Sequence, residues 1–328
     1  MKHLDLGRYA LISCAAAAML AGCSGTQAGQ PIPTPGLSAN LATTQKMSRS
    51  SGDLLYVSDG VNDVRVFTIP QGNLVQILTS VSRPQLQCSD ENGNVFIGDS
   101  SGGKLVEFAH GGKNPINILY LNHYVIPGGC SVDSTTGDVA VAGFRDGGQG
   151  EVDVYSGAQG TPTAYTIPGF AGYYACAYDA GGNLYVDGGD ASSDFLLAEM
   201  RKGSDTFTKI SLDATINEPH SLQSEGGYLA ITGAESERYN LIYRFKVKGS
   251  TAKLVNTILL ERSTRSETWI EEGTVAGQFC NKPSARNIKC KAIALWEYPS
   301  GGEPTTVIRS DNFNKKSSIR GLSVSVAP

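Results

Sequence analysis

The chain has 328 residues and a formal net charge of −4 at pH 7, and only 18% of its residues are charged. This balance excludes the strongly basic surface that nucleic-acid-binding domains present, so we expect no nucleic-acid partner. The 39 glycines indicate many tight turns. The apolar runs are short, β-branched or aromatic, and bounded by Gly, Asn, Asp or Pro, which predicts an all-β fold.

Residues 1–22 have the features of a bacterial lipoprotein signal peptide. Lys2 and Arg8 supply positive charge ahead of an apolar run of ten residues. A transmembrane helix needs about 20 apolar residues, so this run is too short to span a membrane. The run leads into Leu-Ala-Gly-Cys, which resembles the lipobox of bacterial lipoproteins and predicts acylation of Cys23, palmitate included. The alternative is an ordinary secretory signal with a chance cysteine.

Residues 23–50 are expected to form the lipidated cysteine and a disordered tether. Apart from the cysteine they consist largely of Ser, Thr, Gln, Gly, Ala and Pro, which bury too little apolar surface to offset the entropy of ordering. Ser24 follows the cysteine, and by resemblance to Gram-negative lipoproteins a residue other than Asp there favours the outer membrane. We therefore expect an exported protein whose lipid anchor attaches it to a membrane of the cell envelope.

Residues 51–328 contain an internal repeat whose copies are 40 to 45 residues apart. The copies share a short strand motif, and its central residues are Val57, Ile97, Val141, Val186, Ile231 and Val275. A repeat of this length with four short strands in each copy predicts a β-propeller. The expected fold is a six-bladed β-propeller with four-stranded blades.

The second copy shows the expected order of strands. They are predicted at residues 85–89, 94–99, 104–109 and 115–121. The Asn-Gly pair at residues 92–93 favours a tight turn between the first two of these strands. The first copy lacks an inner strand, and residues 319–326 resemble one, so we expect the C-terminal strand to complete blade 1. This closure removes two exposed sheet edges.

Two turn-and-strand segments, which begin at Asp133 and Asp179, are similar to NHL-repeat propellers and to the gluconolactonase-like family. The resemblance covers most of residues 54–326, and its motifs specify fold rather than function. Gluconolactonase-like enzymes hold a divalent cation on the axis with Glu, Asn and Asp at the starts of inner strands. The corresponding carboxylates here are only Glu218 and Glu267, and nearby arginines would repel a cation.

The sequence therefore favours a non-catalytic propeller that binds a small molecule or an envelope protein, and we expect a monomer. The candidate binding residues are expected at one end of the central channel, where the inner strands begin: Arg83, Tyr173, Glu218, His220, Glu267 and Arg320. We assign no catalytic residue and no metal ligand. The alternatives are a metal-dependent hydrolase or lactonase with an atypical axial site, and a structural module of an envelope assembly.

No cofactor is predicted, although Ca²⁺ prefers oxygen ligands such as those of an acidic loop. Asp187, Asp190 and Asp194 form such a loop, but their spacing does not match an EF-hand.

The cysteines divide into two groups. Cys88, Cys130 and Cys176 take the same repeat position on the inner strands, and we expect them to be small buried core residues. Cys280 and Cys290 flank a loop in the last copy. We expect these two to form a disulfide, which an exported location permits.

Overall fold

The computed structural model describes residues 52–122, 124–145, 150–236, 239–280, 292–309 and 319–328. The described residues belong to one unit, which runs from Lys46 to Pro328. The predicted signal peptide (1–22) and the predicted tether (23–50), which includes Cys23, lie outside the described residues. In the part of the chain that is described, no helix has the length and apolar character needed to span a membrane.

Across the described ranges the structure is almost wholly β, with 24 strands and one short 3-10 helix, η1 (Ser156–Ala158). Four of its sheets contain four strands each. The first consists of β24 (Gly321–Ser325), β1 (Leu54–Ser58), β2 (Val64–Thr68) and β3 (Leu74–Leu78). The second consists of β4 (Pro84–Ser89), β5 (Val95–Asp99), β6 (Lys104–Phe108) and β7 (Pro115–Tyr120). The third consists of β8 (Tyr124–Val132), β9 (Val139–Arg145), β10 (Gly150–Tyr155) and β11 (Thr163–Tyr165). The fourth consists of β20 (Ser263–Glu271), β21 (Thr274–Phe279), β22 (Ala292–Glu297) and β23 (Thr306–Arg309).

The remaining strands form one eight-stranded sheet with two antiparallel halves. One half consists of β12 (Gly172–Tyr178), β13 (Leu184–Gly189), β14 (Phe195–Met200) and β15 (Thr208–Leu212). The other consists of β16 (Pro219–Glu225), β17 (Tyr228–Ser236), β18 (Tyr239–Lys248) and β19 (Thr251–Glu261). Their outer strands β15 and β19 pair in parallel over two residue pairs, Ser211 with Thr251 and Leu212 with Ala252. The prediction of six separate four-stranded sheets is therefore met only in part, because two outer edges pair instead of staying apart.

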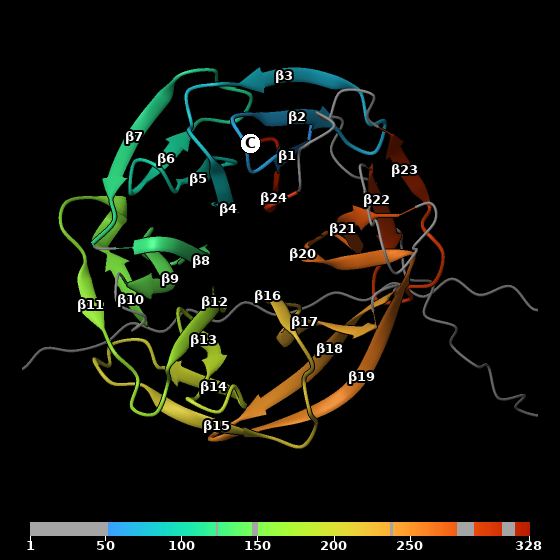
Figure 1. Cartoon of the computed structure of the whole chain (residues 1–328). Coiled ribbons are helices and arrows are strands. Elements are labelled where there is room, and N and C mark those ends of the chain that lie inside the picture. Colours follow the sequence, from blue (N-terminus) through green and yellow to red (C-terminus); the bar gives the residue numbers. More distant parts are fainter. Residues whose placement is uncertain (1–51, 123, 146–149, 237–238, 281–291, 310–318) are drawn as a thin grey trace, which may run out of the picture. The chain divides into compact units, whose positions relative to one another are not determined.

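The sheets are arranged in a ring, with β4, β8, β12, β16, β20 and β24 innermost (Figure 1). Each inner strand contacts the next one around the ring, and β20 contacts β24 to complete the circuit. The inner strands therefore converge on a central axis, and this convergence brings residues far apart in sequence to one place.

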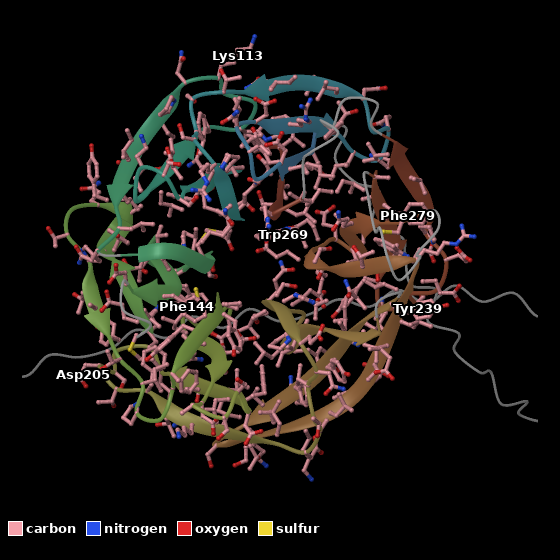
Figure 2. All side chains as sticks on the ribbon, viewed as in Figure 1. Lys113, Phe144, Asp205, Tyr239, Trp269 and Phe279 are labelled. Atoms are coloured by element: carbon pink, nitrogen blue, oxygen red, sulfur yellow. A yellow bond between two sulfur atoms is a disulfide. The ribbon has the colours of Figure 1, made fainter. Side chains whose placement is uncertain are left out.

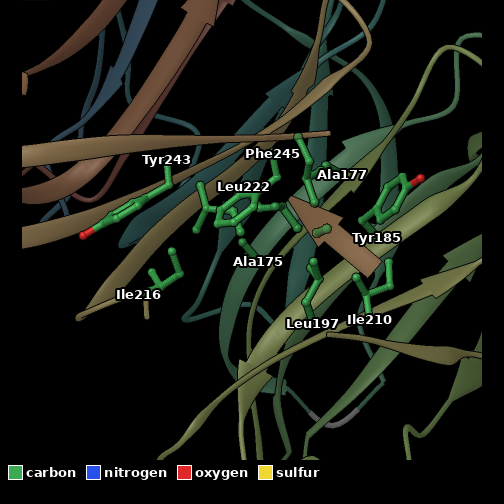
Figure 3. Packing of buried hydrophobic residues seen from close by; sticks show 12 residues of the cluster. Ala175, Ala177, Tyr185, Leu197, Ile210, Ile216, Leu222, Tyr243 and Phe245 are labelled. Atoms are coloured by element: carbon green, nitrogen blue, oxygen red, sulfur yellow. The ribbon is translucent and has the colours of Figure 1, made fainter. Parts of the chain in front are cut away.

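The hydrophobic core lies between neighbouring sheets. Because the strands near the axis are covered on both faces, they contain continuous apolar runs: every residue of β1 is buried. The outer strand β3 instead alternates between exposed and partly buried residues. Figure 3 shows one such layer, in which Leu197 of β14 and Leu222 of β16 belong to the same buried cluster as Phe245 of β18.

The predicted tight turn after β4 is confirmed. Gly93 has φ +78°, a conformation that residues with a Cβ rarely adopt. The Asp90 Oδ1 atom accepts hydrogen bonds from the backbone N–H groups of Asn92 (3.0 Å) and Asn94 (2.7 Å). The turn is thus formed by local residues, which explains why its sequence predicts it.

The C-terminal strand joins the first sheet, as predicted. β24 pairs antiparallel with β1 from Leu54 opposite Ser325 to Ser58 opposite Gly321. Leu322 and Val324 are buried in the core. The last strand of the chain therefore protects the edge of β1, which otherwise would be open to pairing with another chain.

Candidate functional site

The central channel is narrow where the inner strands lie close together. Its constriction is a cavity of about 40 Å³, lined by residues from all six inner strands. This volume suits a water molecule rather than a metabolite. The polar residues that line it are Gln87, His220, Ser221, Gln223, Glu267 and Thr268.

Several of these polar side chains connect neighbouring strands. Gln87 Nε2 donates to Ser58 Oγ at 2.6 Å, and Ser323 Oγ donates to Gln87 Oε1 at 3.0 Å. On the opposite wall, Gln223 Oε1 accepts a hydrogen bond from the Ile270 N–H at 2.7 Å. These contacts tie adjacent sheets together, so much of the polar lining of the constriction serves the fold.

Glu267 enters the channel because β20 contains a wide bulge. In the pairing of β20 with β21, Ser263 lies opposite Phe279 and Thr268 lies opposite Gly277, so the strand holds extra residues between these pairs. Burial raises the pKa of Glu267 to about 8, although the charge of Arg320 and a hydrogen bond from the Leu322 N–H oppose this shift. Burial therefore favours the neutral acid over the carboxylate at Glu267, and the neutral acid is the poorer ligand for a hard cation.

Trp269 separates the constriction from a wider cavity. Its side chain is half-buried, lines both cavities and lies near the centre of the ring (Figure 2). It packs against two apolar clusters, one of which includes Leu86 and Cys88 on the far side of the channel. The indole N–H donates to Glu271 Oε2 at 3.4 Å. The indole therefore forms the base of the wider cavity.

The wider cavity, which we call the channel mouth, has a volume of about 370 Å³. Its lining combines an apolar floor that includes Trp269, Leu222 and the Cys88–Cys130 pair with polar groups near the strand ends. These polar groups are Ser89, Ser131, Ser224, Glu225, Glu271 and Glu272. The volume lies in the usual range of ligand pockets, and the exposed lining is predominantly polar, which suits a polar ligand.

Comparison with known proteins supports the fold. No protein-family model and no curated protein matches the chain. A chain of the nidogen/laminin complex superimposes with a TM-score of 0.63 and 11% identity, covering 84% of this chain and 99% of that chain. A protein of unknown function from Bacteroides caccae superimposes with a TM-score of 0.58 and 11% identity, over the same shares of the two chains. The fold is a β-propeller. At this level of identity, the likeness extends to the fold alone.

The channel mouth lies at the opposite end of the propeller's inner strands from the predicted binding residues. Those residues are at the starts of the strands, whereas Ser89 and Glu271 of the mouth end β4 and β20. Of the predicted set, His220 and Glu267 line the constriction together. Arg320 is exposed but close enough to act on the Glu267 carboxyl.

The other predicted residues lie at the surface or in the hydrophobic core. Arg83 and Glu218 are exposed just before β4 and β16, with φ of +49° and +44°. Tyr173 lies in the hydrophobic core instead, with its ring centroid 5.3 Å from that of Phe170. Its hydroxyl accepts a hydrogen bond from the Ile167 N–H at 2.6 Å. Although Tyr173 is near the start of its strand, its large ring is buried in the core and does not reach the channel.

Trp269 is the residue that sequence reasoning missed. It lies opposite Ala276, one residue after the central residue of the repeat motif, so it corresponds to Gly129, Ala175 and Ser221 of other copies. An indole where these copies have Gly, Ala or Ser is the signal that the sequence offers. The repeat motif is defined on the second strands, so it does not point to this residue.

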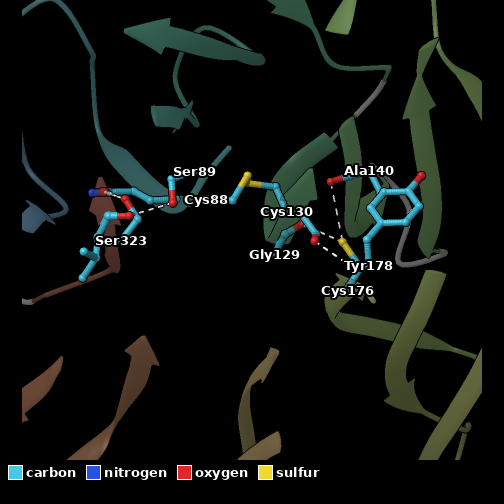
Figure 4. The surroundings of a disulfide bond; sticks show 11 residues. Cys88, Ser89, Gly129, Cys130, Ala140, Cys176, Tyr178 and Ser323 are labelled. Atoms are coloured by element: carbon cyan, nitrogen blue, oxygen red, sulfur yellow. Dashed lines mark hydrogen bonds between the residues drawn. A yellow bond between two sulfur atoms is a disulfide. The ribbon is translucent and has the colours of Figure 1, made fainter. Parts of the chain in front are cut away.

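Two of the three inner-strand cysteines form a disulfide, which corrects the expectation that they are all unpaired core residues. Cys88 on β4 and Cys130 on β8 are bonded, with their Cα atoms 5.6 Å apart (Figure 4). Cys176 is a buried free thiol whose Sγ contacts the carbonyl oxygens of Gly129 and Ala140, each at 3.6 Å. Burial raises its pKa to about 12. Convergence of the inner strands on the axis brings the bonded pair within reach.

The predicted disulfide between Cys280 and Cys290 falls partly outside the described residues. Cys280 is disulfide-bonded. Its predicted partner Cys290 lies outside the described residues, so this pairing stays a prediction.

The acidic loop considered for Ca²⁺ does not converge. Asp187 is wholly buried on β13, where its Oδ1 atom accepts the Ala175 N–H at 2.7 Å. Asp190 instead closes an exposed turn through the N–H groups of Ser192 and Asp194. Within the described ranges, no group of three His, Cys, Asp or Glu side chains is placed to hold a metal ion.

Proposed function

We propose that this chain is an exported lipoprotein, anchored to the cell envelope through Cys23, whose six-bladed propeller binds a ligand at the channel mouth without catalysis. In this proposal the eight-stranded sheet counts as two blades. The observation that carries the proposal is the mouth itself: a cavity of about 370 Å³ with an indole and a disulfide at its base and polar groups around it.

The axial constriction supports binding over hydrolysis. A cavity of about 40 Å³ does not admit a lactone or ester. Its carboxyl, Glu267, has a pKa of about 8 and faces the positive charge of Arg320. A divalent cation on the axis would have to displace the proton that burial favours on Glu267, and the Arg320 guanidinium would repel it.

The likeness to solved structures is consistent with a protein ligand. The nidogen/laminin structure is a complex between proteins, and a propeller face offers a broad surface for such contacts. Outer-membrane anchoring would place this face where it meets envelope proteins. A small polar molecule at the same mouth is the other kind of ligand to be tested.

Thermal shift measurements test the proposal with a defined panel: sugars, amino acids, small amines and γ-lactones. The wild-type protein is compared with Trp269→Phe, which keeps an aromatic floor, and Trp269→Ala, which removes it. A ligand at 100 times its Kd stabilises by about 2.7 kcal/mol, which raises the Tm by several degrees. We expect the shift to survive in the Phe variant and to be lost in the Ala variant. Turnover of a lactone would instead overturn the non-catalytic assignment.

A protein ligand is tested by photo-cross-linking in cells. A benzophenone amino acid replaces Glu272, which is exposed at the mouth, or Lys253, which is exposed on the outer strand β19. A discrete adduct at Glu272 and none at Lys253 supports a protein partner at the mouth. No adduct, together with no thermal shift across the panel, contradicts binding there. Replacing Cys23 with Ala should abolish palmitate labelling and release the protein from membranes.

A further inference from the structure

A second cavity lies between two neighbouring sheets, away from the axis. Its volume is about 480 Å³, and its walls come from the sheet β4–β7 on one side and the sheet β8–β11 on the other. It shares only Val132 with the lining of the channel mouth. We call it the side groove. Its size is ample for a small organic molecule or for a side chain of a larger one.

Glu107 on β6 is the central feature of the side groove. Only 9% of this residue is exposed, and its carboxylate accepts a hydrogen bond from the Asn117 side chain. The described residues that line the groove include Asp90, Glu91 and Asp133 but no Lys, Arg or His. Among the described residues, Glu107 has no cationic partner. A buried carboxylate without a counter-ion is costly, so its retention in a cavity needs an explanation.

The chain contains an internal control for this site. Glu199 on β14 takes the same place as Glu107, since it lies opposite Tyr185 just as Glu107 lies opposite Phe96. Glu199 is also buried, but it accepts a hydrogen bond from the Tyr185 hydroxyl at 2.9 Å. In addition, it pairs with Arg201, two residues further along, at 3.4 Å.

Both of these partners are absent around Glu107. Phe96 replaces the tyrosine and so has no hydroxyl, and Ala109 stands where Arg201 stands after Glu199. Glu107 instead lines the side groove, whereas Glu199 contacts the Tyr185 phenol and the Arg201 guanidinium. The missing groups define what would complete the site: a positive charge with N–H donors, next to an apolar surface.

We propose that the side groove binds the ammonium or guanidinium group of an organic cation, with Glu107 as its counter-ion. Charge-assisted hydrogen bonds from such a group satisfy the carboxylate directly. Phe96 supplies an apolar wall for the carbon stem of the ligand, and Asp90 and Asp133 add negative charge. The same chemistry is presented by a free amine or guanidine and by a Lys or Arg side chain of a polypeptide.

Calorimetric titration of the purified full chain with n-butylguanidinium tests the proposal, with n-butanol and butyrate as controls of similar size. We expect binding of the cation alone, weakened at least tenfold by Glu107→Gln. Glu199→Gln is the matched control, because it removes the same charge from the equivalent position of another sheet, and it should leave the affinity unchanged. Equal binding of butanol or butyrate, or undiminished binding by Glu107→Gln, overturns the proposal, as does no binding at millimolar concentrations.

A second variant keeps the proposal testable if Glu107→Gln fails to fold. Ala109→Arg places a guanidinium where Arg201 stands beside Glu199, and it should abolish binding while the melting temperature stays the same or rises. Retained binding would contradict a role for Glu107 as counter-ion.

The blocked tripeptide Ac-Gly-Arg-Gly-amide distinguishes the sources of the cation. Binding at least as tight as that of butylguanidinium supports a polypeptide ligand, and weaker binding supports a free one. Because Trp269 does not line the side groove, Trp269→Ala should not affect these titrations. Failure of the channel-mouth proposal and failure of this one are therefore separate results.

Discussion

Cys88 and Cys130 are 42 residues apart in sequence, yet their disulfide joins neighbouring inner strands in the wall of the central channel. The bond links two different sheets, which otherwise are held together by side-chain packing and by hydrogen bonds such as those from Asn117 to Ala158 and from Tyr155 to Tyr120. It also lies on the floor of the channel mouth, next to Trp269. Stability and the shape of the candidate site therefore depend on the same pair of residues.

Replacement of both bonded cysteines by Ala should lower the free energy of unfolding by roughly 2–4 kcal/mol, because the unfolded chain regains the freedom that a loop of this length removes. Urea unfolding measures this loss. Addition of a reductant should destabilise the wild-type protein but affect the double variant less. Equal stability of the wild type and the double variant would show that the bond contributes nothing to the fold.

Cys176 should resist modification in the folded protein. Burial raises the pKa of its thiol to about 12, so the reactive thiolate is scarce at neutral pH. We expect iodoacetamide to label Cys176 only after denaturation, which mass spectrometry of the peptide that contains it can measure. Labelling of the native protein at the rate of an exposed thiol would contradict this burial.

Asp187 should make stability fall as the pH rises. Burial raises its pKa in the folded state to about 7, from an ordinary value of 3.8. The folded state therefore holds the proton more tightly, and this contribution is fully present below pH 4 and is lost as the pH rises toward 7. The expected slope is at most about 1.4 kcal/mol per pH unit.

The variant Asp187→Asn should reduce that slope and leave the part that is due to Glu267, since Asn stays neutral and still accepts the Ala175 N–H. Urea unfolding at pH 5, 6, 7 and 8 measures it for the variant and the wild type. Asp190→Asn, in an exposed turn, is the matched control and should keep the wild-type slope. If Asp187→Asn has the same slope as the wild type between pH 5 and pH 7, the raised pKa of Asp187 is contradicted.

Deletion of residues 319–328 should prevent the domain from folding as a monomer. The deletion removes β24, and with it two buried side chains, Leu322 and Val324, each worth roughly 1.5–3 kcal/mol. It also exposes the edge of β1 to other chains. Size-exclusion chromatography and circular dichroism should show aggregation, whereas removal of Pro328 alone should change neither. A truncated monomer that melts like the full chain would contradict closure by β24.

Gly321→Val tests the same closure with one substitution. A Cβ at this position would collide with the carbonyl oxygen of Gln85 on β4. We expect a loss of several degrees in Tm, measured by differential scanning calorimetry. Gly203→Ala is the comparison, since Gly203 is an exposed turn residue with open space around it, and only the milder cost of its positive φ should appear.

The features that can be inferred from the amino-acid sequence are local or periodic. The turn at Asp90 to Gly93 depends on the side chain of its own first residue and on a glycine with positive φ, so it can be inferred from a few letters. The strands that form the sheets follow from short apolar runs at regular spacing. The closing strand at residues 321–325 could be inferred because one copy of the repeat lacks an inner strand.

Features that depend on distances between remote residues follow from the packed fold and not from the sequence pattern. Cys88 bonds to Cys130 while Cys176 stays free, although all three are on inner strands of the repeat. Glu107 and Glu199 have the same place in their sheets, but only one has a cationic partner. The physical reason is that convergence on the axis and packing between sheets set these distances. A repeat pattern specifies which residues are equivalent, but not which neighbours each of them meets.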